Sequence, residues 1–264
     1  MRGASRTTGG CSPRSDVTEE LPLLWQYSFS NFNEKVRWAL DRKGIRHRRR
    51  SMLPGGPRSL VFSRAGTIPV LDLDGRRIVD STRIIAALEE RRPEPTLYPA
   101  DPGERSRALE IEDYLDEGAG HDVRRVLFWE ARDRTSWIVE FMTTDQPRAR
   151  RAFLRAVLPG VRFVMRRRFA IRREDVERSR GTLLEALDRL ESERGGRDYL
   201  VGDHFTVADL TAGALLYPLV WPPQFPYELP ERPPSEFAES VRDHPTLAWL
   251  AGLWRRERGD SAAV

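Results

Sequence analysis

The sequence predicts an α/β domain near the N-terminus followed by a larger domain built only of helices. Three observations lead to this prediction. Strand-like and helix-like patterns alternate over residues 21–92. Residues 93–103 are rich in proline and polar side chains, which is typical of a linker. Over residues 104–256 the apolar side chains recur at helical spacing. A chain of 264 residues is long enough for two such domains.

Composition and charge exclude several classes of protein. The chain is 39% hydrophobic and 32% charged, which is typical of a globular protein with a charged surface. Its 44 basic and 40 acidic residues form a mixed surface, so we expect no nucleic-acid partner. Lys35 and Lys43 are the only lysines, and this arginine bias is typical of a high-GC genome. No apolar run approaches the roughly 18 residues that cross a bilayer.

The two ends of the chain are predicted to be tails. Residues 1–20 are small and polar and lack the apolar core of a secretory signal, so we expect a disordered tail and a cytoplasmic protein. Residues 257–264 form the second tail. Cys11 is the only cysteine, which excludes an intrachain disulfide. The histidines show no metal-ligand spacing, so no metal is expected; they are His47, His121, His204 and His244.

Local signals place the elements of the first domain. Leu24, Trp25 and Tyr27 suit a strand, and a helical pattern begins near Phe32. Residues 45–50 are a candidate edge strand. Asp74-Gly75 is a hairpin signal between two short strands. Ser81 is the predicted N-cap of the helix that follows.

The helical domain contains one clear start signal and two unusual segments. Thr206 and Asp209 predict a capping box, with Phe205 and Leu210 at the positions of a hydrophobic staple. Residues 142–175 are an extra basic segment, in which Pro159-Gly160 is expected to break or kink the helix. We favour a helix pair folded over the site; the alternative is membrane-surface contact through residues 150–173. Residues 217–237, rich in aromatics and proline, are either a pocket wall or a long packed loop.

The turn Ser30-Asn31-Phe32-Asn33 places two small polar side chains where a strand leads into a helix. Taken by itself, such a pair is an ordinary turn with a helix N-cap. The alternative is a functional pair aimed at a ligand. From the residues of the turn alone, we favour the ordinary turn.

The chain resembles the glutathione S-transferase superfamily over residues 22–255. Members of this family have a thioredoxin-like N-terminal domain followed by an all-helical domain. Four stretches, in this order and spacing, produce the resemblance: "SNFNEKVRWAL", "GTIPVLDLDG", "DSTRII" and "FTVADLTAGALL".

The resemblance implies that Ser30 occupies the position of the family's catalytic Ser, Cys or Tyr. A hydroxyl hydrogen bond and a helix N-terminus both favour the thiolate, which is the nucleophilic form of a thiol. Asn33 stands where C-x-x-C proteins have their second cysteine, and its amide either donates to the thiolate or caps the helix. Tyr27 is the reserve hydroxyl. With no cysteine at either position, redox chemistry by a protein disulfide is excluded.

The resemblance also implies a binding site for the rest of glutathione. Ile68-Pro69 matches the family's cis-proline, where the backbone of Ile68 pairs with a peptide-like ligand. Asp80 and Ser81 match the residues that hold the γ-glutamyl end: Asp80 suits an ammonium, and Ser81 with the helix N-terminus suits a carboxylate. A plain helix cap at Ser81 is the alternative.

One departure from the family concerns the glycine end of glutathione. Thr67 stands where a longer polar side chain usually contacts the thiol peptide. Losing one charge-assisted hydrogen bond costs ~1.5–3 kcal/mol, so we expect glutathione affinity in the millimolar range or weaker. Arg48, Arg58 or Arg64 would restore the contact if one of them reached the site. Glutathione ranks first, and a sugar-linked cysteine thiol is the alternative.

Together, these observations predict a cytoplasmic enzyme, expected to be a homodimer, that activates glutathione at Ser30 and attacks a small apolar electrophile. The alternatives are a non-catalytic binding or regulatory protein on the same fold and a thiol-dependent isomerase, dehalogenase or ether-cleaving enzyme.

Overall fold

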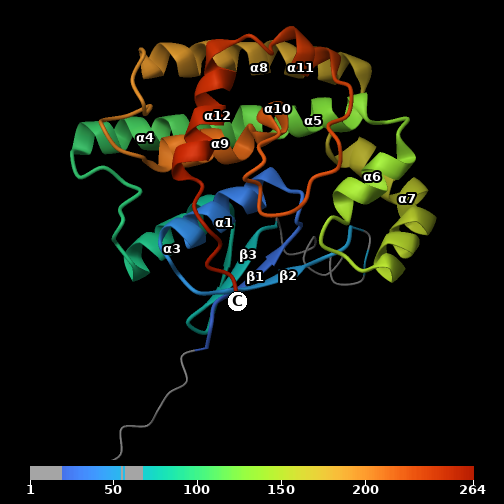
Figure 1. The fold of residues 1–264 in the computed structure, drawn as a ribbon, viewed down its shortest axis with the longest axis horizontal. Coiled ribbons are helices and arrows are strands. Elements are labelled where there is room, and N and C mark those ends of the chain that lie inside the picture. Colours follow the sequence, from blue (N-terminus) through green and yellow to red (C-terminus); the bar gives the residue numbers. More distant parts are fainter. Residues whose placement is uncertain (1–19, 55, 57–67) are drawn as a thin grey trace, which may run out of the picture.

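The protein is described by a computed structural model in which residues 20–54, 56 and 68–264 are placed. Cys11, Arg58, Arg64 and Thr67 lie outside these described residues. The N-terminal domain contains a four-stranded sheet in the order β2-β1-β3-β4 (Figure 1). β1 pairs with β2 in parallel and with β3 in antiparallel, and β4 completes a hairpin with β3. The strands are β1 (Leu23–Gln26), β2 (Arg48–Ser51), β3 (Val70–Leu73) and β4 (Arg76–Val79).

Two helices separate this sheet from the helical domain: α1 (Asn31–Arg42) and α3 (Ser81–Arg91) (Figure 1). The side chains of β1 alternate, as the pleat of a strand requires. Leu24 is fully buried in the main core that α1 and α3 share with the helical domain. Trp25 belongs to a second, smaller cluster with Met52 and Val70 on the opposite face of the sheet.

Helices alone form the rest of the chain, which confirms the predicted fold class. They are α4 (Pro102–Tyr114), α5 (Gly120–Glu130), α6 (Thr135–Met142), α7 (Arg148–Arg168), α8 (Arg173–Arg194), α9 (Val207–Leu215), α10 (Tyr217–Val220), α11 (Glu236–Ser240) and α12 (Pro245–Glu257). A π-helical turn, Leu115–Ala119, joins α4 to α5. No helix in the described part of the chain combines the length and apolar character needed to cross a bilayer.

The buried helix α9 forms the predicted capping box. The Asp209 carboxylate accepts the Thr206 N–H at 2.9 Å and the Leu200 N–H at 2.9 Å. Burial raises the pKa of Asp209 to about 6. α9 packs directly on α1, so this cap fixes the helix on which the N-terminal domain rests.

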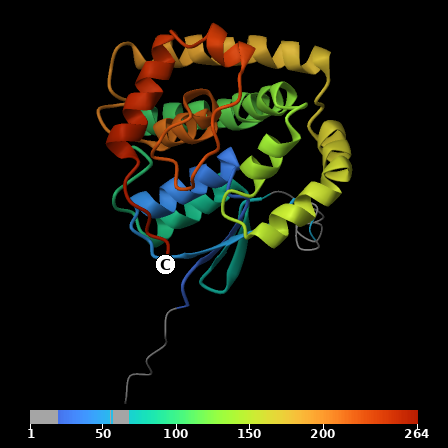
Figure 2. The ribbon, with the colours of Figure 1, turned by 45° about the vertical axis from the view of Figure 1, so that its right-hand side comes forward.

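Pro159-Gly160, where the sequence predicts a break or a kink, does not break the helix, because α7 runs from Arg148 to Arg168. A kink at this point stays a prediction. Proline removes one helical hydrogen bond. Pro159 lies on the exposed side of α7, where water can satisfy the freed carbonyl, so the helix continues. α6 and α7 pack as a pair beside the β2 edge of the sheet (Figure 2).

Residues 257–264, predicted to be a tail, are docked on the N-terminal domain. The Ala262 N–H donates to the Asp41 carboxylate at 2.9 Å, and the Val264 N–H donates to the His47 carbonyl at 3.0 Å. Ala263 and His47 form a parallel β-bridge. The buried carboxylate of Asp41 therefore holds the end of the chain, at a separation along the sequence that no local pattern reveals.

Candidate functional site

The register of the sheet brings three separate segments to one edge. Trp25, near the end of β1, is paired with Val70 at the start of β3, and Val70 is paired with Val79 at the end of β4. The turn that begins α1, the residue before β3 and the turn that begins α3 therefore meet at the same end of the sheet. These segments contain Ser30, Ile68-Pro69 and Asp80-Ser81. The Ile68-Pro69 peptide bond is cis, as the resemblance implies.

Ser30 is the residue that precedes α1, but its side chain does not cap the helix. Its backbone N–H donates to the Tyr27 carbonyl at 3.1 Å, which closes the turn. The half-buried hydroxyl forms no hydrogen bond with another described residue. Because the N-terminus of α1 carries the positive end of the helix dipole, this hydroxyl lies where an anion is favoured.

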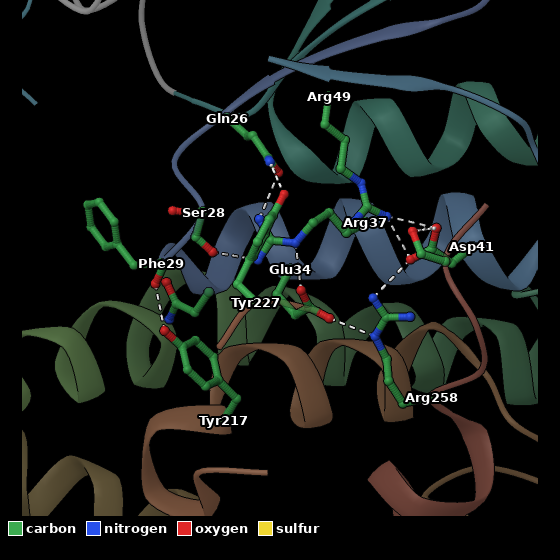
Figure 3. A network of polar contacts seen from close by, with 12 residues as sticks. Gln26, Ser28, Phe29, Glu34, Arg37, Asp41, Arg49, Tyr217, Tyr227 and Arg258 are labelled. Carbon is green, nitrogen blue, oxygen red and sulfur yellow. Dashed lines mark hydrogen bonds and ion pairs between the residues drawn. The ribbon is translucent and has the colours of Figure 1, made fainter. Parts of the chain in front are cut away.

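Two residues hold the loop between β1 and α1 from behind (Figure 3). The Arg37 guanidinium donates to the carbonyls of Tyr27 at 3.4 Å and Ser28 at 3.0 Å. The hydroxyl of Tyr217, from the helical domain, donates to the Phe29 carbonyl at 2.6 Å. Burial raises the pKa of Tyr217, so this hydroxyl keeps its proton. The backbone before Ser30 is thus fixed by both domains.

Asn31 fastens the first turn of α1 to the helical domain. Its amide donates to the carbonyls of Gly120 at 2.8 Å and Leu215 at 3.1 Å. Gly120 directly follows the π-helical turn, and π-turns leave carbonyls without their usual helical donor. A Cβ at Gly120 would lie 2.7 Å from Leu215 Cδ1 and 3.1 Å from Phe32 Cζ, so only glycine allows this close approach.

Asn33 is fully buried, and neither polar atom of its side chain has a hydrogen-bond partner among the described residues. It is therefore not the helix cap that was one of its two predicted roles. Donation to a thiolate, the other role, stays a prediction.

Asp80, rather than the predicted Ser81, is the residue that caps α3. Its exposed carboxylate accepts the N–H groups of Thr82 at 3.1 Å and Arg83 at 3.3 Å. Its φ of 83° is a strained value for a residue with a Cβ, and such strain gathers at functional turns. Ser81 is instead the first residue of α3, and it is 4% exposed.

A buried ionic cluster lies directly beneath this cap. Lys35 Nζ lies 2.8 Å from Glu112 and 2.6 Å from Asp116, and the Thr82 hydroxyl donates to Asp116 at 2.9 Å. Burial raises the pKa of Glu112 more than the neighbouring ammonium lowers it. The cluster ties α1, α3 and the α4 region together, and sequence analysis did not find it.

The comparisons with known proteins agree with this architecture. The model of the glutathione S-transferase N-terminal domain matches residues 24–96, and the model of the C-terminal domain matches residues 173–239. Together the two matches cover more than half of the chain. The chain belongs to the glutathione S-transferase superfamily. Residues 97–172, which include the π-helical turn, α6 and all of α7, lie outside both matches.

Individual relatives match this transferase-family chain over only part of its length. Maleylacetoacetate isomerase of Mus musculus is 34% identical over 107 residues, which are 37% of this chain and 48% of that protein. The chain thus spans about half the length of the curated relatives it matches.

Solved structures extend the likeness over nearly the whole fold. The beta-etherase LigF of Sphingobium sp. strain SYK-6 has a TM-score of 0.64 at 20% identity, covering 90% of this chain and 97% of that one. A glutathione S-transferase of Methylobacterium radiotolerans, solved in complex with glutathione sulfonate, has a TM-score of 0.59 at 22% identity, covering 90% and 92%. At these identities the likeness establishes the fold alone.

Of the remaining predicted contacts of this transferase-family site, Arg48 and Tyr27 are described by the structure and the others are not. Arg48 is paired with Leu23, at the start of β1, so it lies at the opposite end of the sheet from Ser30 and does not reach the site. Tyr27 packs against the smaller apolar cluster, with its ring 5.6 Å from that of Phe29. Thr67, Arg58 and Arg64 fall outside the described residues, so the contact to the glycine end of glutathione stays a prediction.

Proposed function

We propose that this chain is a glutathione-dependent enzyme in which the Ser30 hydroxyl stabilises the glutathione thiolate. The observation behind this proposal is the state of Ser30: its hydroxyl is uncommitted, although Arg37, Tyr217 and Asn31 fix the backbone on both sides of it. A turn held in this way positions a donor without needing that donor for its own stability.

The chemistry follows from the acidity of the thiol. A free thiol has a pKa of ~8.5, so at neutral pH most of it is the unreactive protonated form. A hydroxyl that donates to sulfur stabilises only the thiolate, and the N-terminus of α1 acts in the same direction. Each unit by which the thiol pKa falls corresponds to ~1.4 kcal/mol.

The other end of glutathione fits the turn before α3. The exposed carboxylate of Asp80 suits the γ-glutamyl ammonium, and the backbone N–H and hydroxyl of Ser81, at the N-terminus of α3, suit the α-carboxylate. The backbone of Ile68, next to the cis bond, supplies the edge on which the cysteinyl part of glutathione can pair.

Two reactions are compatible with a thiolate held at Ser30. Attack on an electrophile forms a conjugate, and reversible addition to a double bond allows isomerisation. The curated relative named maleylacetoacetate isomerase favours the second reaction as the alternative. A non-catalytic binding protein on the same fold would retain glutathione binding and lose turnover. The homodimer and the cytoplasmic location stay predictions.

Ser30→Ala tests the proposal, with Ser28→Ala as a matched control. Losing a donor that acts in the transition state costs ~10²-fold or more in rate. We therefore expect kcat/KM for glutathione conjugation to fall by about that factor in Ser30→Ala, with the melting temperature unchanged. The Ser28 hydroxyl instead accepts from Thr144 at 3.1 Å, so Ser28→Ala should lose only a few-fold. Equal effects in the two variants would refute the role of Ser30.

A further inference from the structure

A cleft of about 510 Å³ lies between the edge strand β2 and the turn that joins α6 to α7. Residues 49–51 form one wall, and residues 145–147 with Arg150 form the other. The ring of Tyr227 completes the lining. Figure 2 shows the α6–α7 pair beside this edge of the sheet. No predicted glutathione contact lines the cleft.

The cleft carries more positive charge than its own groups neutralise. Arg49 is paired with both carboxylate oxygens of Asp41, each at 2.8 Å, so its charge is already balanced. Arg50 and Arg150 are exposed, and neither forms an ion pair with any residue in the described ranges. Asp145 is the one acidic residue of the lining, and it accepts from the Gln146 amide at 2.9 Å. If Asp145 balances the charge of one of these two arginines, the charge of the other is not neutralised.

Arg50 and Arg150 are held in position by groups that do not cancel their charge. The Arg50 guanidinium lies over the ring of Trp25, 5.2 Å from its centroid. Arg150 donates to the Gln146 side-chain oxygen at 2.7 Å. A guanidinium that is already oriented loses less rotamer freedom when it binds an anion. These contacts favour recognition of a carboxylate over non-specific attraction.

The cleft adjoins the loop that carries Ser30. Gln26, the last residue of β1, donates to the Ser51 hydroxyl at 3.0 Å and to the Tyr227 hydroxyl (Figure 3). The Thr144 hydroxyl, next to the cleft wall, donates to Ser28 at 3.1 Å. The ring of Tyr227 is itself held by Arg37, 5.2 Å from its centroid. A molecule in the cleft therefore contacts Tyr227, which packs on Arg37, one of the side chains that fix the β1–α1 loop.

We propose that this cleft binds the carboxylate of the second substrate, so that the electrophile this enzyme accepts is an organic anion. Arg50 and Arg150 bind the carboxylate from opposite walls, while Tyr227 and Pro147 contact the apolar part of the molecule. The role of the bound anion as a substrate rests on the proposed function. The binding of an organic anion by the cleft does not depend on it. An anionic substrate also replaces the purely apolar electrophile of the sequence prediction.

The test compares 4-chloro-3-nitrobenzoate with its methyl ester, which has the same ring and leaving group and no charge. Calorimetric titration without glutathione measures binding alone, so it does not depend on catalysis by Ser30. A second arm measures kcat/KM with glutathione, corrected for the uncatalysed reaction of each compound. The variants are Arg50→Gln and Arg150→Gln. The control is Arg155→Gln, which removes an exposed charge from the same helix outside the cleft.

We expect the wild-type protein to bind the carboxylate about tenfold more tightly than the ester, the scale of one charge-assisted hydrogen bond. Arg50→Gln and Arg150→Gln should each reduce that preference several-fold, and Arg155→Gln should retain it. Glutathione affinity should be unchanged in all three. Equal affinity for the two compounds, or an equal loss in Arg155→Gln, would overturn the proposal. A parallel loss of glutathione affinity would also overturn it, because the arginines would then serve a carboxylate of glutathione.

Discussion

Two helices of the N-terminal domain begin in different ways: one uses the side chain before it as a cap and the other does not. The residue before a helix usually accepts an N–H of the first turn with its side chain. Asp80 does so for α3. Ser30 does not for α1, although serine is among the best residues at that position. The backbone around Ser30 is held by Asn31 and Arg37 instead, and the Ser30 hydroxyl is left without a bond to a described residue.

Asp80→Asn separates the charge of Asp80 from its structural role. An asparagine oxygen can still accept from Thr82 and Arg83, and asparagine tolerates a positive φ. We therefore expect little change in melting temperature and roughly tenfold weaker glutathione binding, because a charge-assisted contact to the ammonium is lost. The rate of the saturated enzyme should change less, since the contact is remote from sulfur. Calorimetric titration that gave wild-type affinity would contradict this role.

The two lysines show which site residues a sequence can indicate. In a chain with 42 arginines, both lysines are fully buried and bound at several points. Lys35 lies between Glu112 and Asp116, and Lys43 donates to the carbonyls of Arg92 at 2.7 Å and Pro95 at 3.0 Å. A compact ammonium fits such enclosed sites better than a planar guanidinium. The rarity of lysine can be seen in the sequence, but the residues that these two lysines contact cannot be inferred from it.

At the scale of single elements, the π-helical turn is the feature that joins the domains at the site. It lies between α4 and α5, where Asn31 takes up the carbonyl of Gly120. The sequence contains two glycines here, Gly118 and Gly120, and only the second is in close contact with other elements. Glycine content alone does not distinguish them.

Gly120→Ala should destabilise the protein, and Gly118→Ala should not. The new methyl group at position 120 would lie 2.7 Å from Leu215 Cδ1, and overpacking of this kind costs ~1–3 kcal/mol. Nothing lies within 4 Å of a methyl group at position 118, so the gain in helix propensity should leave stability equal or up to ~1 kcal/mol higher. Urea unfolding measures both. Equal stabilities for the two variants would show that Gly120 is not tightly packed against Leu215 and Phe32.

Elements with strong local signals were predictable, and elements that depend on tertiary contacts were not. The hairpin at Asp74-Gly75 and the capping box of α9 follow from neighbouring residues, and both are present. Serine is a common helix cap, so the sequence favours Ser81 as the cap of α3, although Asp80 takes that role. The course of α7 through Pro159 depends on the exposure of that side of the helix, which the sequence does not reveal.

At the scale of the whole molecule, a buried charged network joins the N-terminal domain to the end of the chain (Figure 3). Arg258 lies 2.8 Å from Glu34 and 2.9 Å from Asp41. Glu34 also pairs with Arg37 at 2.7 Å, and Arg37 holds the β1–α1 loop. Glu34 and Arg258 are 224 positions apart, so no local pattern predicts the pair. The two domains and the candidate site are therefore fixed by one network.

Arg258→Met should lower the free energy of unfolding by roughly 3–5 kcal/mol, the usual loss when one partner of a buried ion pair is removed. Methionine retains an apolar stem, so the lost charge is the main change. Arg255→Met is the control, because Arg255 is exposed in the last turn of α12, just before Arg258, and has no ion pair with a described residue. Losses within about 0.5 kcal/mol of each other in chemical unfolding would contradict a structural role for the network.

The pKa of the thiol of bound glutathione tests whether the Ser30 hydroxyl stabilises the thiolate. Thiolate absorbance of the complex is titrated against pH for the wild-type protein and for Ser30→Ala, with glutathione kept saturating for both. We expect a thiol pKa at least about one unit below the free value of ~8.5 in the wild-type complex, and a return toward that value in Ser30→Ala. A bound thiol with the same lowered pKa in both proteins, or with an ordinary pKa in the wild-type protein, would contradict it.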